Sequence, residues 1–163
     1  MIIRKIQLKD AKEISRIYNY YIKNTIITFE ENEIDYLEIE NRIKNITSKY
    51  PWYVYEDNNG NILGYAYASK WKARYSYRFT AETTIYLDSS NTGKGIGLKL
   101  YTELLDSLKF LNIHAVMAII SIPNEKSQNI HEKLGFKKAA HFKEVGYKFG
   151  KWIDIGYWEM LLD

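Results

Sequence analysis

The stretch AETTIYLDSSNTGKGIGLKLY, residues 81–101, decides the fold of this chain. After Glu82 its first half is β-branched and aromatic, which is typical of a buried strand. Glycines at positions 93, 95 and 97 then form a turn, and leucines at helical spacing predict a helix over 95–111. A glycine turn that opens a helix exposes backbone N–H groups, which bind phosphates. The segment therefore predicts a strand, an anion-binding loop and a helix, with an unexpected carboxylate where the strand begins.

The residues that precede this segment predict one strand and two helices. Apolar and polar residues alternate over 2–8 in the manner of a strand. Asp10 with Glu13, and Asp35 with Glu38, have the capping-box spacing that begins a helix. Apolar residues recur every three or four positions behind each box, so both helices are expected to be amphipathic.

A hairpin and a basic connector come next. Residues 52–56 and 62–69 are strand-like and flank DNNGN, which predicts a turn at Gly60. The following stretch, KWKARYSYR at 70–78, is basic and aromatic and is expected to be a connector.

The C-terminal third predicts a buried strand, a short helix and two more strands. Residues 114–120, HAVMAII, form a continuous apolar run of the kind buried on both faces of a sheet. The short helix within 123–136 is expected to end at Gly135, and strands are expected at 137–147 and 152–162. The order β-α-α-β-β-β-α-β-α-β-β predicts one α/β domain over 1–163 with a mixed sheet.

Composition narrows the classes of function. The 163 residues, 46% of them hydrophobic and 15% aromatic, suit one globular domain. The chain has no cysteine, which excludes disulfides, thiolate metal ligands and a cysteine nucleophile. The three histidines are 17 and 10 residues apart, which matches no metal-ligand spacing, so no metal is expected. No run approaches the roughly 18 apolar residues of a membrane span, and we expect a soluble, cytoplasmic protein without membrane partners.

The glycine loop has two interpretations from its own residues. It cradles a phosphate, or it only permits tight packing. It does not fit a P-loop, because no Lys-Ser/Thr pair follows its last glycine, and it does not fit a dinucleotide fold, because it follows a late strand of the sheet.

The loop TGKGIG at 92–97 resembles the acyl-CoA pyrophosphate loop of GNAT acetyltransferases, Arg/Gln-x-x-Gly-x-Gly/Ala. Gly95 and Gly97 match the two glycines. Thr92 stands at the Arg/Gln position and brings no charge, so Lys94 or the loop amides are expected to compensate. The resemblance implies that the CoA phosphates and the acyl arm lie against the following residues: Ile85, Tyr86, Leu87, Thr92, Gly93, Lys94, Gly95, Ile96, Gly97, Leu98 and Asn124.

Five further segments, in order, resemble the phosphinothricin and methionine sulfoximine N-acetyltransferase branch. They are TFEE, GYAYASKWKAR, AETTIYL, IPNEKSQNIHEKLGF and VGYKFGKWIDIGYWE. The resemblance implies a GNAT fold, with a mixed, mostly antiparallel twisted sheet flanked by helices. It also implies a homodimer that uses acetyl-CoA as co-substrate. The acetyl group would pass directly, in a ternary complex, to the α-amino group of a small amino-acid analogue.

Glu82 lies where this family has its acid, so the resemblance implies a general base. Attack by an amine requires that its ammonium lose a proton, and burial among Thr, Ile and Tyr would raise the pKa of the carboxyl toward a useful range. The alternative is a strand-edge glutamate that faces solvent. Backbone N–H groups of Ile85 to Leu87 would polarise the thioester carbonyl if the strand separates from its neighbour there.

Two residues of the short helical segment within 123–136 each have two interpretations. Many GNAT enzymes protonate the leaving thiolate with the tyrosine of Y-x-K-x-GF. This chain reads HEKLGF, which gives His131 that role or leaves it packed on a helix face. Asn124 resembles the asparagine that bonds the pantetheine arm, and it also suits the N-cap of the helix.

The acceptor pocket is expected to need cationic and hydroxyl donors for a carboxylate and a polar head group. The candidates are Phe29, Glu30, Lys72, Arg74, Tyr75 and Arg78, and further ones are Lys148 and Trp152, the last two across a dimer. The alternative for the connector 70–78 is a solvated basic loop.

Other functions stay open at this stage. In one alternative the enzyme acetylates a different primary amine or a standard amino acid. In another the chain is a CoA-binding sensor without catalysis. A nucleic-acid binder using the connector 70–78 is disfavoured by the net charge of only +3.

Overall fold

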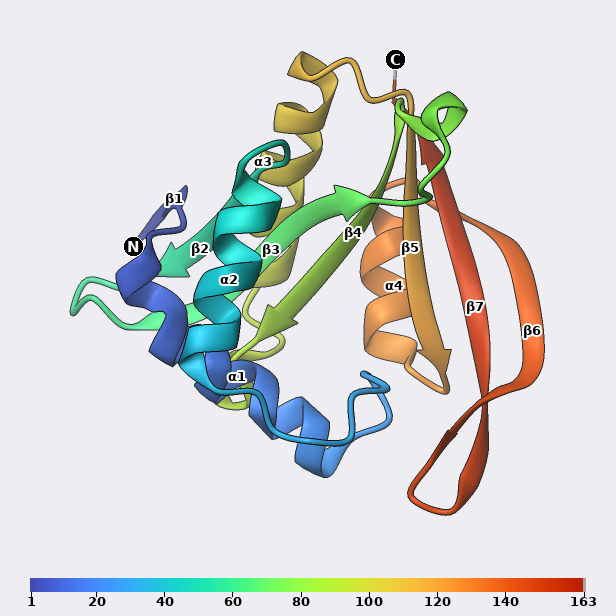
Figure 1. Ribbon diagram of the computed structural model, residues 1–163, viewed down its shortest axis with the longest axis horizontal. Coiled ribbons are helices and arrows are strands. Elements are labelled where there is room, and N and C mark those ends of the chain that lie inside the picture. Colours follow the sequence, from blue (N-terminus) through green and yellow to red (C-terminus); the bar gives the residue numbers. More distant parts are fainter. Residues whose placement is uncertain (163) are drawn as a thin grey trace.

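The structure is a computed structural model that describes residues 1–162, and it has the predicted order of elements (Figure 1). The strands are β1 (Ile2–Lys5), β2 (Trp52–Glu56), β3 (Ile62–Lys70), β4 (Thr80–Leu87), β5 (Ala115–Ile122), β6 (Lys137–Lys148) and β7 (Lys151–Leu161). The helices are α1 (Ala11–Asn24), α2 (Tyr36–Thr47), α3 (Ile96–Phe110) and α4 (Glu125–Lys133). None of these helices in residues 1–162 is long and apolar enough to cross a membrane.

The seven strands form one sheet in the order β1-β2-β3-β4-β5-β7-β6. All neighbours are antiparallel except β4 and β5, which run parallel. The predicted mixed, mostly antiparallel sheet is therefore confirmed.

The parallel pair separates partway along its length. Its register covers only Thr80 to Thr83 opposite Ala115 to Ala118, although β4 continues to Leu87 and β5 to Ile122. Figure 1 shows the two strands diverging toward the N-terminal end of α4. Beyond Thr83, the edge of β4 that faces β5 is therefore not paired with β5 and borders the gap between the two strands.

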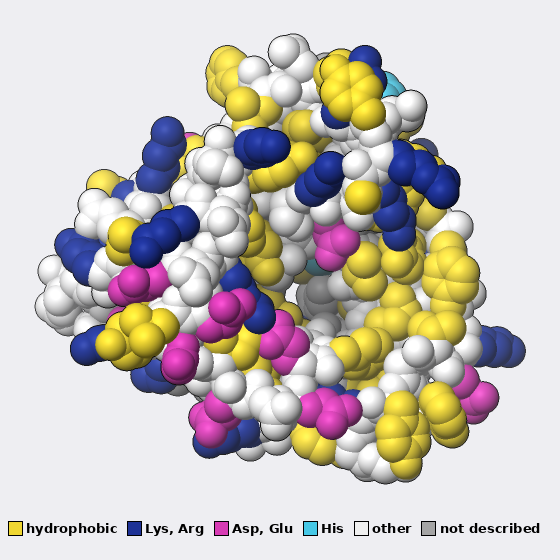
Figure 2. All heavy atoms as spheres, viewed as in Figure 1, with side chains coloured by type: hydrophobic (Ala, Val, Ile, Leu, Met, Phe, Trp, Pro, Cys, Tyr) yellow, Lys and Arg dark blue, Asp and Glu magenta, His cyan; other side chains and the backbone are white. Residues whose placement is uncertain are grey.

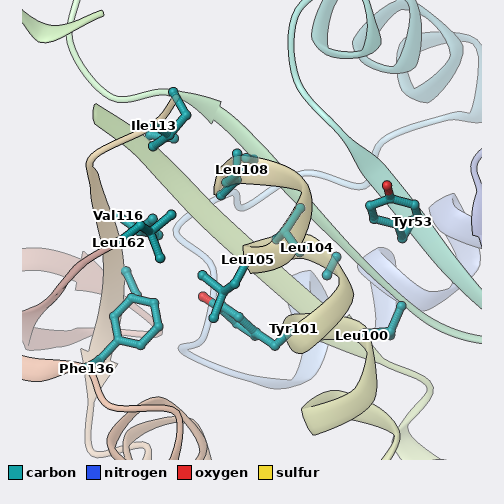
Figure 3. Close-up of a cluster of buried hydrophobic side chains, with 14 of the residues drawn as sticks. Tyr53, Leu100, Tyr101, Leu104, Leu105, Leu108, Ile113, Val116, Phe136 and Leu162 are labelled. Atoms are coloured by element: carbon teal, nitrogen blue, oxygen red, sulfur yellow. The ribbon is translucent and has the colours of Figure 1, made fainter. Parts of the chain in front are cut away.

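Each face of the sheet carries its own hydrophobic core. On one face, α1 and α2 pack on residues such as Val54 and Tyr65. On the other, leucines of α3 lie beside Val116 of β5, as Figure 3 shows. Because neighbouring residues of a strand point to opposite faces, each central strand contributes to both cores.

Local signals explain most of the element ends. Asp35 accepts a hydrogen bond from the Glu38 amide at 2.9 Å, as predicted for the beginning of α2. Gly60 takes a positive φ of 85° in the hairpin turn, and Gly135, with φ 100°, directly follows the last turn of α4.

The predictions for the N-terminal segment were partly wrong. The first strand ends at Lys5 because residues 8–10 already form a 3-10 turn. Asp10 does not cap α1, since its own backbone is helical and its carboxylate accepts from the Gln7 amide at 2.8 Å. Arg4 also donates to this carboxylate at 2.7 Å and 2.9 Å. The residue that resembled a cap therefore fastens β1 to the turn before α1.

Candidate active site

A cavity of about 280 Å³ occupies the gap between β4 and β5. Figure 2, in the view of Figure 1, shows the molecule hollowed near the centre of this face. The walls come from β3, β4, β5, β7, the middle of α1, the helix α4 with its N-cap, and the connector between α1 and α2. The lining residues are Tyr18, Ile27, Thr28, Phe29, Tyr67, Glu82, Thr83, Thr84, Ile85, Tyr86, Ala118, Ile119, Ile120, Ser121, Asn124, Ser127, His131 and Ile155.

Two backbone amides of β4 face the gap. The Asp88 amide, just after β4, donates to the Leu63 carbonyl of β3 at 2.9 Å, so the hydrogen-bonded pairs with β3 recur at even-numbered residues of β4. The carbonyl of Phe79, an odd-numbered residue just before β4, accepts from the amides of His114 and Ala115 on the β5 side. Odd-numbered backbone groups of this segment therefore point to β5. The amides of Ile85 and Leu87 consequently point to the β5 side, where β5 has moved away. The amide of Tyr86 points to β3, and its side chain lines the cavity instead.

Glu82 enters the cavity from the face of the sheet that carries α1 and α2. Its neighbour Thr83 bonds the Tyr101 hydroxyl of α3 at 2.6 Å, so Glu82 must face the opposite way. Burial raises the pKa of the Glu82 carboxyl, and the Lys72 ammonium partly opposes this. The ion pairs formed by residues 1–162 do not include Glu82. A carboxylate of this kind suits removal of a proton from a cationic ligand.

A tyrosine-rich wall lies beside Glu82, which sequence reasoning missed apart from Tyr86. Tyr18 and Tyr67 both line the cavity. The Tyr18 hydroxyl is 2.8 Å from Thr28 Oγ1, and burial raises the pKa of Tyr18 to about 12. In the sequence, the spacing of Tyr65 and Tyr67 along β3 indicates that these two rings share one face of the sheet, and this was the available signal for Tyr67.

The predicted acceptor residues separate into two groups. Phe29 lines the cavity, whereas Glu30 lies behind it, where it accepts hydrogen bonds from Tyr18 at 3.0 Å and from Arg42 at 2.8 Å. Lys72 is close enough to Glu82 to lower its pKa.

No residue of the basic connector 70–78 lines the cavity, and apart from the half-buried Trp71 the connector is exposed. Arg74 and Tyr75 are solvent-exposed. The Arg78 guanidinium lies 4.4 Å from the ring centre of Tyr75 and 4.3 Å from that of Phe79. Among the connector candidates, Lys72 is the one whose charge lowers the pKa of Glu82.

His131 is buried, and protein groups engage both nitrogens of its ring. Nδ1 is 2.6 Å from the Ser127 carbonyl, and because a carbonyl can only accept, this nitrogen carries a proton. Nε2 is 2.7 Å from the Tyr101 hydroxyl, which is itself 2.6 Å from the Thr83 hydroxyl. Burial lowers the pKa of His131, so the ring is neutral and accepts from Tyr101. A chain of hydrogen bonds therefore runs from Thr83, in the cavity wall, to His131.

The glycine loop offers an open backbone at the beginning of α3. Gly93 and Gly95 have positive φ values of 78° and 77°, and apart from each glycine and its two chain neighbours no atom of residues 1–162 lies within 4 Å of where their Cβ would be. Lys94 is exposed, with Nζ 2.8 Å from Asn91 Oδ1, and Thr92 is extended. Ile96 buries its side chain in the core and leaves only its amide for a ligand. This arrangement fits a pyrophosphate at a helix N-terminus.

Gly97 serves a different purpose from the other two glycines. A Cβ at this position would come 2.9 Å from Ile130 Cδ1 of α4 and 3.5 Å from Ile85 Cδ1. Gly97 therefore allows α3 to pack closely on α4 and β4, which is the tight-packing interpretation, while Gly93 and Gly95 fit the phosphate interpretation. Leu98 is half-buried in the first turn of α3.

Asn124 lies both at the N-cap of α4 and in the cavity wall. Its side chain accepts from the Ser127 amide at 3.2 Å and so caps α4, and the residue also lines the cavity. Residues 1–162 contain no group of three or more His, Asp or Glu side chains that could hold a metal ion.

Comparison with known proteins identifies the family. The Acetyltransferase (GNAT) domain model matches residues 3–156. The chain is 34% identical to the phosphinothricin N-acetyltransferase of Streptomyces viridochromogenes, over 96% of this chain and 85% of that protein. It is 32% identical to the L-methionine sulfoximine/L-methionine sulfone acetyltransferase of Salmonella typhimurium, over 100% of this chain and 95% of that protein.

A solved structure supports the same conclusion. The GNAT superfamily phosphinothricin acetyltransferase from Sinorhizobium meliloti, in complex with acetyl-CoA, has a TM-score of 0.96 and 34% identity, covering 99% of this chain and 88% of that one. This chain belongs to the GNAT acetyltransferase family and is an acetyl-CoA-dependent N-acetyltransferase.

Proposed function

We propose that the enzyme acetylates the α-amino group of a small amino-acid analogue of the phosphinothricin or methionine sulfoximine type. The names of its relatives support this acceptor class. The observation that carries the proposal is Glu82, a carboxylate with raised pKa in the cavity between β4 and β5, toward which the amides of Ile85 and Leu87 point by the register of β4.

In the proposed mechanism Glu82 takes a proton from the acceptor ammonium, directly or through a water. The amine nitrogen then attacks the thioester carbonyl carbon; the C–N bond forms and the C–S bond breaks. The amides of Ile85 and Leu87 stabilise the negative charge that develops on the carbonyl oxygen. The loop at Gly93 to Gly95 holds the CoA phosphates, and Asn124 the pantetheine arm. Holding the two reactants in line is itself a large part of the rate enhancement.

The proton that the departing thiolate needs is assigned to His131. This role requires the imidazolium form of the ring, because the neutral ring holds its one proton on Nδ1 against the Ser127 carbonyl. From Nε2 of the imidazolium the proton would pass to the thiolate through the hydroxyl groups of Tyr101 and Thr83, and the ring would return to its neutral form. Thr83 and His131 both line the cavity, so the two ends of this hydrogen-bond chain face the ligand site.

The test of the acceptor class is release of CoA thiol from acetyl-CoA in the presence of different amines. The panel contains phosphinothricin, methionine sulfoximine, methionine sulfone, the standard amino acids and spermidine. Release with the first three supports the proposal. Release with another amine keeps the chemistry and replaces the acceptor, and measurable acetyl-CoA binding without release from any amine favours a sensor.

We also propose that the enzyme is a homodimer in which the β6–β7 hairpin contacts the second copy. β6 is an edge strand with a single neighbour in the sheet. Five large apolar side chains of this hairpin are solvent-exposed: Phe142, Val145, Tyr147, Phe149 and Trp152. Hydrophobic side chains gather on the β6–β7 side of the molecule in Figure 2, and exposed apolar patches of this kind mark interfaces.

Sedimentation equilibrium tests this assembly. Trp152→Glu should convert two copies to one, whereas Phe110→Glu, at an exposed aromatic residue on α3, should not. A wild-type monomer, or a Trp152→Glu dimer, would contradict the proposed interface. A cytoplasmic location, a single domain over 1–163 and the exclusion of nucleic acid as a partner stay predictions from the sequence.

A further inference from the structure

Ser121 is a buried hydroxyl group in the cavity wall to which neither the sequence nor the mechanism gives a role. It lies near the end of β5, and its side chain is 3% exposed. Within residues 1–162 its Oγ has no hydrogen-bond partner. A buried hydroxyl without a partner costs free energy, so its presence in a cavity wall points to a ligand that completes the bond.

The alternation of β5 places this hydroxyl on the same face of the sheet as Glu82. Val116, Ala118 and Ile120 belong to the core beneath α3, so Ser121 faces the opposite way. Glu82 also faces away from α3. The two side chains thus extend into one chamber from the two strands that diverge, and Ser121 is four residues along β5 from Met117, the partner of Glu82 in the register. Four residues of strand span about 13 Å.

The connector between α1 and α2 closes the chamber at the Ser121 end. Ser121 is opposite Ile155 of β7 in the register, and Ile155 lines the cavity. A Cβ on Gly146 would collide with the ring of Phe29, so this ring lies directly on the backbone of β6. Phe29 and Ile155 thus give apolar walls to the chamber that the Ser121 hydroxyl enters.

We infer that Ser121 binds the end of the acceptor that is remote from its amino group, and that it selects acceptors with a hydrogen-bonding group there. This rests on the proposed function, in which the amine lies at Glu82. The apolar walls would hold the carbon chain of the acceptor. A hydroxyl both donates and accepts, so an oxygen or an N–H on sulfur or phosphorus satisfies it, whereas a methyl group does not. Ser121 is thus a specificity-determining residue.

The test compares Ser121→Ala with the wild type on methionine sulfone and on methionine, which lacks the two sulfone oxygens. The ratio of kcat/KM for the sulfone to that for methionine should fall about three- to tenfold in the variant, through KM for the sulfone. KM for acetyl-CoA should not change. The free energy of unfolding should not fall, because the variant removes a hydroxyl that has no partner in the protein. Ser48→Ala, at an exposed serine that follows α2, is the matched control and should preserve the ratio.

The outcomes separate this inference from the proposed function. An unchanged ratio in an active Ser121→Ala enzyme overturns the role of Ser121 and leaves the acceptor class standing. A rise in KM for acetyl-CoA also overturns it, because the hydroxyl would then contact the thioester arm. If the wild type acetylates neither amine, both the acceptor class and the role of Ser121 fail.

Discussion

The Nζ of Lys148 donates a hydrogen bond at 2.7 Å to the carbonyl oxygen of Thr28, a residue 120 positions earlier in the chain. Lys148 is 2% exposed, and burial lowers its pKa. The sequence suggested this lysine as a substrate contact across a dimer. Within the chain it instead ties the β6–β7 hairpin to the connector that forms one wall of the cavity.

Lys148→Met should therefore loosen the wall that Phe29 provides without affecting the CoA loop. We expect KM for the acceptor to rise about five- to tenfold and KM for acetyl-CoA to stay constant, because the lost bond is worth about 1–1.5 kcal/mol. Steady-state kinetics with both substrates varied would measure this. Lys143→Met, at an exposed lysine of the same strand, is the control. Equal rises in both Michaelis constants would indicate general loosening and contradict the assigned role.

Glu82→Gln removes the proposed base while it preserves the shape of the side chain. General base catalysis contributes about 10²- to 10⁴-fold, so kcat should fall by that amount while KM for acetyl-CoA changes little. Single-turnover measurement of CoA release separates chemistry from binding. A variant with nearly full kcat would show that Glu82 is not the base.

The pH dependence of the reaction should report the environment of Glu82. The base must be ionised to act, so kcat/KM should rise with pH through the pKa of this carboxyl, which burial raises. The Lys72 ammonium lowers the same pKa, and Lys72→Met should consequently move the acidic limb of the profile to higher pH. Lys70→Met, at an exposed lysine nearby in the chain, should leave the limb in place. A limb that moves to lower pH in Lys72→Met contradicts the electrostatic argument.

The sequence predicted the elements far better than the walls of the site. Strands and helices follow from periodicity and end signals such as Gly60 and Gly135, which are local. Asp10 misled because its carboxylate serves the turn before α1, and the spacing to Glu13 gives no hint of that. The cavity depends on where β4 and β5 separate, and this distance between strands is not encoded in the pattern of either one.

Some residues of the site are recognisable from local sequence, and others are brought to the site by tertiary packing. Glu82 and the glycines of the loop are recognisable by their type in an unusual position. Tyr18, Thr28 and Ser121 are ordinary residues of a helix, a connector and a strand, and tertiary packing alone brings them to one cavity. Alternation from Glu82 was the available signal for Thr84 and Tyr86.

Gly95→Val offers a direct test of the phosphate loop. A side chain at φ 77° is strained, and at Gly95 it would also occupy the open side of the α3 N-terminus. KM for acetyl-CoA should rise at least tenfold. Gly60→Val is a matched control, because Gly60 has φ 85° and equally open surroundings in a hairpin turn away from the cavity. Both variants should lose comparable stability, but only Gly95→Val should lose affinity for acetyl-CoA, which calorimetric titration measures. Equal affinity in the two variants would leave the loop without its proposed ligand.

The buried position of His131 predicts how stability depends on pH. In the unfolded chain its pKa is near the ordinary value of 6.5, and in the folded protein burial lowers it. The folded state therefore binds fewer protons than the unfolded state in the interval below pH 6.5. It follows that the stabilisation from a neutral His131 is fully present above pH 6.5 and is lost as the pH falls through that interval. Chemical unfolding followed at several pH values should show this loss, and His131→Gln, which does not titrate, should show a smaller one. A His131→Gln protein with the same acid dependence as the wild type would mean that another group is responsible, and that the histidine is not held neutral by Tyr101 and Ser127.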